Sequence, residues 1–92
     1  MVEWKDLEIF LAKRNLYNVL KAIEVEPKSL TRISKETGIR FEHVSRYVKE
    51  LVELGYITNL TPGITKGKVF EASEPGMAIL GEIKNKKLFE KE

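Results

Sequence analysis

The 92-residue chain contains no cysteine, which removes several kinds of chemistry at once. Without thiols there are no disulfides, no thiolate metal sites and no cysteine nucleophile. Glutamine is absent as well, and aspartate occurs only at Asp6, so lysine and glutamate dominate the 33% of residues that are charged. Charged surfaces rich in lysine and glutamate are typical of thermophile proteins. The composition therefore favours a thermophilic source.

Long apolar runs are also missing. No stretch is long enough to span a bilayer, and the N-terminal sequence MVEWKDLEIF lacks the basic-then-apolar order of a signal peptide. We therefore expect a cytoplasmic protein with no membrane partner. A chain this short buries roughly 60–70% of its unfolded surface, so it folds as one small domain with a modest margin of stability. Because this margin of stability is modest, oligomerisation is favoured.

Histidine occurs once, at His43, so a metal site would need carboxylates almost alone, and we expect no metal. His43 falls beside Tyr47 at the edge of the predicted core, where a phosphate contact or a supporting hydrogen bond is expected. No nucleophile–base pair, glycine-rich phosphate loop or spaced carboxylate pair stands out. The sequence predicts neither enzyme activity nor a cofactor, and it indicates no small-molecule effector.

The stretch from Ser29 to Ile57 carries the clearest pattern. Its sequence, SLTRISKETGIRFEHVSRYVKELVELGYI, predicts a short helix, a tight turn at Gly38, a longer helix that stops at Gly55, and a following strand. Ser29 is the expected N-cap of the first helix, and Gly38 supplies the left-handed conformation that ends it. This order is that of a helix-turn-helix.

A wheel at about 100° per residue gives the longer helix two faces. The residues expected to face the core are Val44, Tyr47, Val48, Leu51 and Leu54. The residues expected on the opposite, polar face are Glu42, Ser45, Arg46, Lys49 and Glu53. The first half of the polar face is basic, so it is the candidate reading surface.

The start of this helix is unusual. Arg40 stands where a serine or threonine cap is commoner, and a cation there opposes the helix macrodipole by a few tenths of a kcal/mol. Either Arg40 meets an anion or its position is chance. The next residue, Phe41, is expected in the core rather than on the surface.

Amphipathic helices and a hairpin flank this motif. Residues 2–13 predict one helix, and the apolar spacing after Asn15 predicts a second that ends before Pro27; whether the two join is left open. The segments YITNLT and KVFEAS predict strands joined by the turn-rich PGITKG. Ser73 caps a last helix, SEPGMAILGEIKNKKLF, whose apolar residues lie on two sides, one for its own domain and one for a partner.

The net charge of +2 is unevenly distributed. Residues 28–49 carry six basic side chains against two acidic ones, a local excess of +4, while Lys66 and Lys68 add two more charges in the hairpin. The remainder of the chain therefore carries −4. A basic footprint on an acidic protein suits a polyanion partner, although a solvated surface and lysines that protect strand edges would give the same pattern.

The segments SLTRISKETGIRFEHVSRYVKELVELGYI, GKVFEAS and SEPGMAIL resemble those of MarR-like, ArsR-like and related archaeal winged-helix transcription regulators. The resemblance implies a mostly helical α+β fold: a winged helix-turn-helix with a three-helix core, a β-hairpin wing and extra N-terminal and C-terminal helices. The expected divisions of this single domain are residues 1–14, the N-terminal helix; 15–72, core and wing; and 73–92, the C-terminal helix.

The function that follows is a sequence-specific regulator of transcription that binds double-stranded DNA as a homodimer. Its second motif helix would enter the major groove, and its wing would contact flanking backbone. The expected DNA contacts are Lys28, Ser29, Arg40, Glu42, His43, Ser45, Arg46, Lys49, Lys66 and Lys68. The expected dimer contacts are Trp4, Leu7, Phe10, Leu11, Ile79 and Ile83.

A protein–protein interaction module is the alternative, because winged helices also serve in assemblies of the transcription machinery. The acidic side chains on the exposed side of the second motif helix, Glu42, Glu50 and Glu53, support it.

Overall fold

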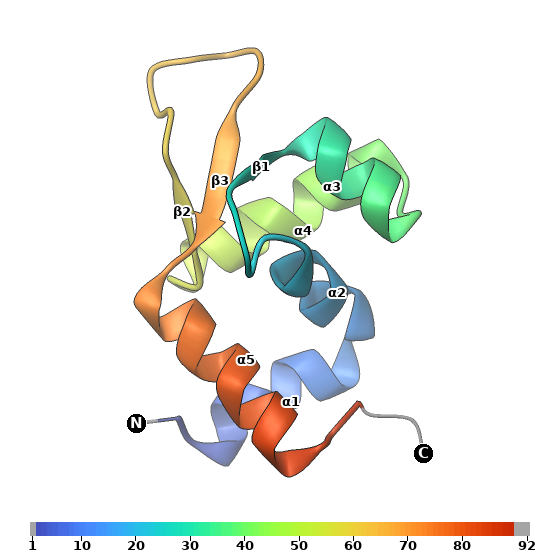
Figure 1. The fold of residues 1–92 in the computed structure, drawn as a ribbon, viewed down its shortest axis with the longest axis vertical. Coiled ribbons are helices and arrows are strands. Elements are labelled where there is room, and N and C mark those ends of the chain that lie inside the picture. The colour runs from blue at the N-terminus through green and yellow to red at the C-terminus, as the bar shows by residue number, and fades with distance from the viewer. Residues whose placement is uncertain (1, 90–92) are drawn as a thin grey trace.

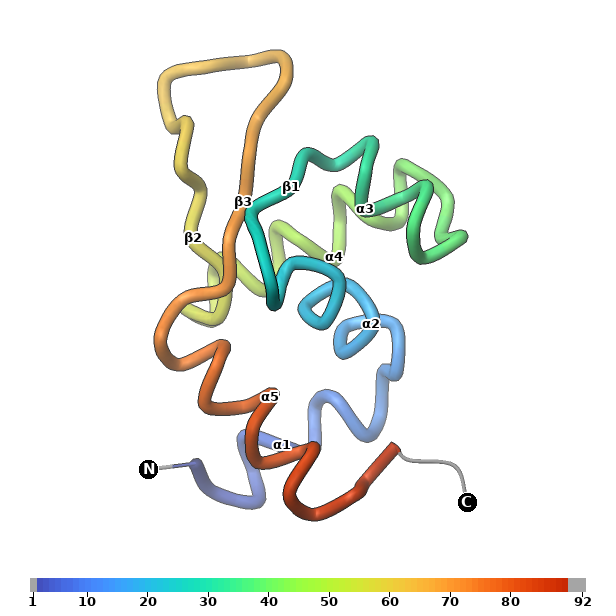
Figure 2. The backbone as a smooth tube through the Cα atoms, in the orientation of Figure 1, coloured from blue at the N-terminus to red at the C-terminus, as the bar shows by residue number. Residues whose placement is uncertain are grey.

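A computed structural model describes residues 2–89, which form five helices and a small antiparallel sheet (Figure 1). The elements in chain order are α1 (Trp4–Ala12), α2 (Arg14–Ala22), β1 (Lys28–Ser29), α3 (Leu30–Thr37), α4 (Phe41–Glu53), β2 (Ile57–Asn59), β3 (Val69–Ala72) and α5 (Glu74–Lys86). The β2–β3 hairpin extends to one end of the molecule, whereas α1 and α5 lie at the opposite end (Figure 2).

The first two helices are separate, and the break lies at Lys13. Its backbone, with φ −128° and ψ 88°, ends α1 and begins α2. Asn15 lies inside α2, where its side-chain oxygen accepts a hydrogen bond from the Asn18 side chain. At the other end, α1 starts with a capping box between Glu3 and Asp6.

The helix-turn-helix forms as predicted. Ser29 Oγ accepts a 3.3 Å hydrogen bond from the backbone N–H of Arg32, and Gly38 adopts φ 77° at the end of α3. Two further side chains fasten the turn: Ser34 donates to the carbonyl of Ile39 at 2.6 Å, and Thr37 donates to that of Ile33 at 2.7 Å. These hydrogen bonds fix the end of α3 and the turn that leads to α4.

The sheet contains one strand more than the predicted hairpin. Its order is β1-β3-β2, with Ile57 opposite Ala72 in one pair and Ser29 opposite Val69 in the other. The two-residue β1 is too short to leave a periodic signal in the sequence. Because Ser29 both pairs with β3 and caps α3, β1 ties the base of the hairpin directly to the helix-turn-helix.

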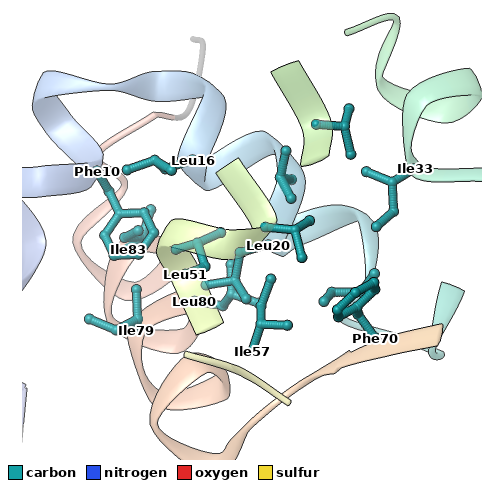
Figure 3. Packing of buried hydrophobic residues seen from close by; sticks show 14 of the residues in the cluster. Phe10, Leu16, Leu20, Ile33, Leu51, Ile57, Phe70, Ile79, Leu80 and Ile83 are labelled. Atoms are coloured by element: carbon teal, nitrogen blue, oxygen red, sulfur yellow. The ribbon is translucent and has the colours of Figure 1, made fainter. Parts of the chain in front are cut away.

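All five helices contribute to one apolar core (Figure 3). Its buried residues are Leu7, Phe10, Leu16, Val19, Leu20, Ile23, Ile33, Val44, Val48, Leu51, Ile57, Phe70, Ile79, Leu80 and Ile83. Two predictions for α4 were wrong. Leu54, the C-cap residue, is 45% exposed because the helix ends there, and Phe41 is 49% exposed because the first residue of α4 projects beyond the core.

The terminal helices use their apolar faces within the protomer. Four of the residues expected at a dimer contact, namely Leu7, Phe10, Ile79 and Ile83, are at most 2% exposed, so that prediction was wrong for them. The expected second apolar side of α5 does not reach a partner because it packs on α1 and α2. Trp4 and Leu11 are the two members of that set with exposed side chains.

Candidate nucleic-acid interface

The polar face of α4 is exposed along its whole length, as the helical wheel predicts. Arg46 and Lys49 lie on this face, and neither has a carboxylate partner within residues 2–89. Arg40 at the helix start does have one: its guanidinium lies 3.1 Å from the Glu42 carboxylate, with both side chains more than half exposed. Because Glu42 sits in the first turn, it offsets the unfavourable charge of Arg40 against the helix dipole.

A cavity of about 230 Å³ lies between the hairpin and the helix-turn-helix. One wall is the hairpin segment from Thr65 to Lys68, and the other is the start of α3 with Phe41 of α4. The hydroxyl-bearing residues at this cavity are Ser29, Thr31 and Thr65. Two lysines, several hydroxyl groups and the N-terminus of α3 thus surround a space of the size of a phosphate group and its sugar.

Lys28 is used differently from the sequence-based prediction. Its ammonium group pairs with the Glu36 carboxylate at 2.5 Å, and its side chain is only 11% exposed. Arg32 bridges Glu36 and Glu26 at 3.1 and 3.2 Å. Lys28 therefore stabilises the β1–α3 junction, and it is not available as a direct phosphate ligand while this ion pair holds.

Hydrogen bonds from Lys28 and then from Arg32 hold the pKa of the Glu36 carboxyl below its usual value. A depressed carboxyl pKa adds stability that is present above the unfolded-state value of about 4.3 and is lost as pH falls through the folded-state pKa. We therefore expect Glu36→Gln to lower the stability of the domain at pH 7 and to have progressively less effect below about pH 4. Urea unfolding of both proteins across this range measures the difference.

Glu8→Gln is the matched control, because Glu8 is exposed on α1 and has no cationic partner among residues 2–89. Its unfolding free energy should follow that of the unaltered protein at every pH. Equal stability of the Glu36→Gln variant and the parent at pH 7 would show that the pair with Lys28 does not contribute.

The structure brings only part of the predicted contact set together. Ser29, Lys66 and Lys68 share the 230 Å³ cavity, while the α4 residues form the adjoining exposed ridge. His43 is half-buried beside this ridge. Within residues 2–89, no three His, Cys, Asp or Glu side chains are grouped so that they could hold a metal ion.

A family profile described as winged helix-turn-helix matches residues 14–91. The chain belongs to this family. In the winged helix-turn-helix, α3 and α4 are the two motif helices and the β2–β3 hairpin is the wing, so the predicted fold class is confirmed. Helix α1 precedes the matched segment. No curated protein sequence matches the chain.

The winged helix-turn-helix is a DNA-binding fold, and that general assignment agrees with the exposed basic face of α4 and the lysines of the wing. No helix within residues 2–89 has the length and apolar character needed to cross a lipid bilayer.

Five residues that line the 230 Å³ cavity were not among the predicted contacts: Leu30, Thr31, Phe41, Thr65 and Gly67. Thr31 and Thr65 line the cavity between wing and α3, and Phe41 forms part of its wall. Thr31 lies two residues after the Ser29 cap, where a first-turn side chain is exposed, so its position was a usable signal. The approach of Thr65 to Thr31 follows from the pairing of β1 with β3, which local patterns do not reveal.

Proposed function

We propose that this protein is a sequence-specific transcription regulator that binds double-stranded DNA as a homodimer. The observation that carries the proposal is the cavity in which wing lysines face the start of α3 beside the exposed basic ridge of α4. A duplex whose major groove receives α4 would place backbone phosphates against the wing lysines. The wing and α4 then form one continuous basic surface.

Within this proposal, Arg46 and Arg40 contact guanine or phosphate, Ser45 lies between them on the reading face, and Glu42 selects cytosine or excludes misplaced phosphates. Lys49, Lys66 and Lys68 contact phosphates and set the register. Ser29 Oγ caps α3 as a hydrogen-bond acceptor, and its hydroxyl hydrogen can still be donated to a phosphate. His43 has a smaller role, because it is half-buried.

Replacing Arg46 with Ala tests the reading role of α4. A lost bidentate contact to guanine costs about 1–3 kcal/mol, so we expect roughly ten- to hundredfold weaker binding of the preferred duplex and a smaller penalty for duplexes changed at the contacted base pair. Selection from a random duplex library identifies the preferred site first, and fluorescence anisotropy with matched and altered duplexes then gives both affinities.

Glu8→Ala serves as the control, since its exposed side chain lies on α1, away from this surface. An unchanged sequence preference in the Arg46→Ala variant would remove Arg46 from the reading set. The same selection also tests the dimer, because a palindrome with half-site centres about 10 base pairs apart, or a multiple, reports two-fold symmetry.

Dimerisation itself would use the outer face of α1. Trp4 is 56% exposed and Leu11 is 42% exposed, and a seven-residue separation places them on one side of the helix. Lys86 lies 5.5 Å over the Trp4 ring, so α5 borders this face. We expect light scattering to show a dimer that Trp4→Ala combined with Leu11→Ala dissociates; a monomer at all concentrations would contradict the dimer.

The alternative function is a protein–protein interaction module. Exposed apolar side chains on the wing side favour it, with Phe41 at 49%, Leu60 at 43% and Ile64 at 48% exposure. The acidic residues of α4 favour it less, because Glu42 pairs with Arg40 and Glu50 with Lys13. A monomer that binds no duplex in the random library would support this alternative against DNA binding.

A further inference from the structure

A second cavity lies at the end of the molecule opposite the wing tip. It measures about 730 Å³ and is bounded by α1, α5 and the segment that joins α4 to β2. Its volume is within the range of about 300–1,000 Å³ that is usual for small-molecule sites. The α4 surface and the 230 Å³ cavity have no residue in common with it.

Part of the cavity lining, which we call its floor, is apolar. Leu54, which the helical pattern places in the core, is 45% exposed and lines the cavity together with Tyr56 and Ile79. Ala78 and Gly81 of α5 lie alongside and keep the space open, since a Cβ added to Gly81 would meet no atom within 4 Å. The space beside Gly81 is therefore open to an apolar body.

Within residues 2–89, the charged side chains that line the cavity are all acidic. They are Asp6, Glu74 and Glu82, and no lysine or arginine of this part of the chain lines it. Glu82 forms an ion pair with Lys86, with 3.4 Å between Oε1 and Nζ, whereas Asp6 and Glu74 have no cationic partner within residues 2–89. Burial, and then the charge of Asp6, raises the pKa of the Tyr56 phenol, which also lines the cavity.

We propose that this cavity binds a small organic cation with an apolar body. The apolar floor accommodates the body, and Asp6, Glu74 and Glu82 attract the positive charge at the rim. A second copy of the chain is a poorer occupant, because a two-fold axis through the cavity would bring like-charged carboxylates together. The dimer face at Trp4 and Leu11 lies on the other side of α1 from Asp6.

Two probe ions of the same shape and opposite charge test the proposal: tetraphenylphosphonium and tetraphenylborate. The net charge of +2 favours the anion if binding is unspecific. We expect nuclear magnetic resonance titration of the full chain to show tetraphenylphosphonium shifting the amide signals of Ala78 and Gly81, and tetraphenylborate leaving them in place. Equal shifts by both ions, or none by the cation at millimolar concentration, would overturn the proposal.

Variants separate charge from shape. Glu74→Gln with Glu82→Gln should weaken cation binding about fivefold, since each exposed charge pair contributes about 0.5 kcal/mol. Glu8→Gln with Glu71→Gln makes the same change of net charge away from the cavity lining and should leave the affinity unchanged. If both double variants weakened cation binding equally, the carboxylates at the cavity would have no local role.

Gly81→Leu fills the cavity and should abolish cation binding without affecting DNA binding. If it instead dissociated a homodimer and left cation binding intact, the face would be an interface between copies, and the proposal would be wrong. Because cation binding is measured without DNA, its failure would leave the proposed regulatory function untouched, and the converse also holds.

Discussion

Replacing Gly76 with Ala should destabilise the domain by about 3 kcal/mol or prevent folding. A Cβ at this position would lie 2.1 Å from the backbone carbonyl oxygen of Tyr56, which a rotamer change cannot relieve. Overpacking costs about 1–3 kcal/mol, and the upper end applies here because α5 itself must move. That movement would strain the Ser73 cap, whose Oγ accepts from Gly76 N–H at 3.1 Å and donates to the Gly55 carbonyl at 2.6 Å.

Gly81→Ala in the same helix is the control. Nothing lies within 4 Å of its added Cβ, so the better helix propensity of alanine should raise the unfolding free energy by about 0.5–1 kcal/mol. Urea unfolding followed by circular dichroism measures both variants. If both variants changed the unfolding free energy in the same direction, the close contact between α5 and Tyr56 would not set the position of α5.

Replacing Lys66 and Lys68 together with alanine should weaken binding of every duplex on the order of a hundredfold. A dimer would lose four exposed ion pairs with phosphates, each contributing about 0.7 kcal/mol. The effect should be uniform across sequences, since phosphate contacts carry no base information. The slope of log affinity against log salt should also become shallower by about one for each lysine lost.

Lys5→Ala with Lys84→Ala removes the same charge from the opposite end of the molecule, where both lysines are exposed. Anisotropy titrations of one duplex should give this control nearly the affinity of the parent protein. If the two double variants weakened binding equally, the effect would come from net charge, and the wing would have no specific part in the interface.

Local signals in the sequence were sufficient for the helix-turn-helix. Ser29 and Ser73 both cap helices, and Gly38 closes α3 in the left-handed conformation. Each of these features depends on residues within one turn, so a short pattern determines it. The same holds for the exposed polar face of α4, because helical periodicity alone separates it from the core.

Features that depend on distant parts of the chain were not predictable. Amphipathicity shows that Phe10 and Ile83 are covered, but the covering surface is the protein's own core and no second protomer. The pairing of β1 with β3 joins residues about forty positions apart, and the partner of Lys28 is decided by how α3 is placed against β1. At the candidate site, the sequence alone located the basic residues. Which of them are free to contact a ligand depends on the ion pairs that form in the folded protein.

The salt dependence of duplex binding tests the proposed function most directly. A dimer that neutralises about six to ten phosphates should lose affinity about a thousandfold or more between 50 and 200 mM salt, with a log–log slope of about −5 to −9. Fluorescence anisotropy of the unaltered protein with a selected duplex gives this slope. A slope of that size is the expected result; an affinity that hardly changes with salt would contradict DNA binding through the α4 ridge and the wing.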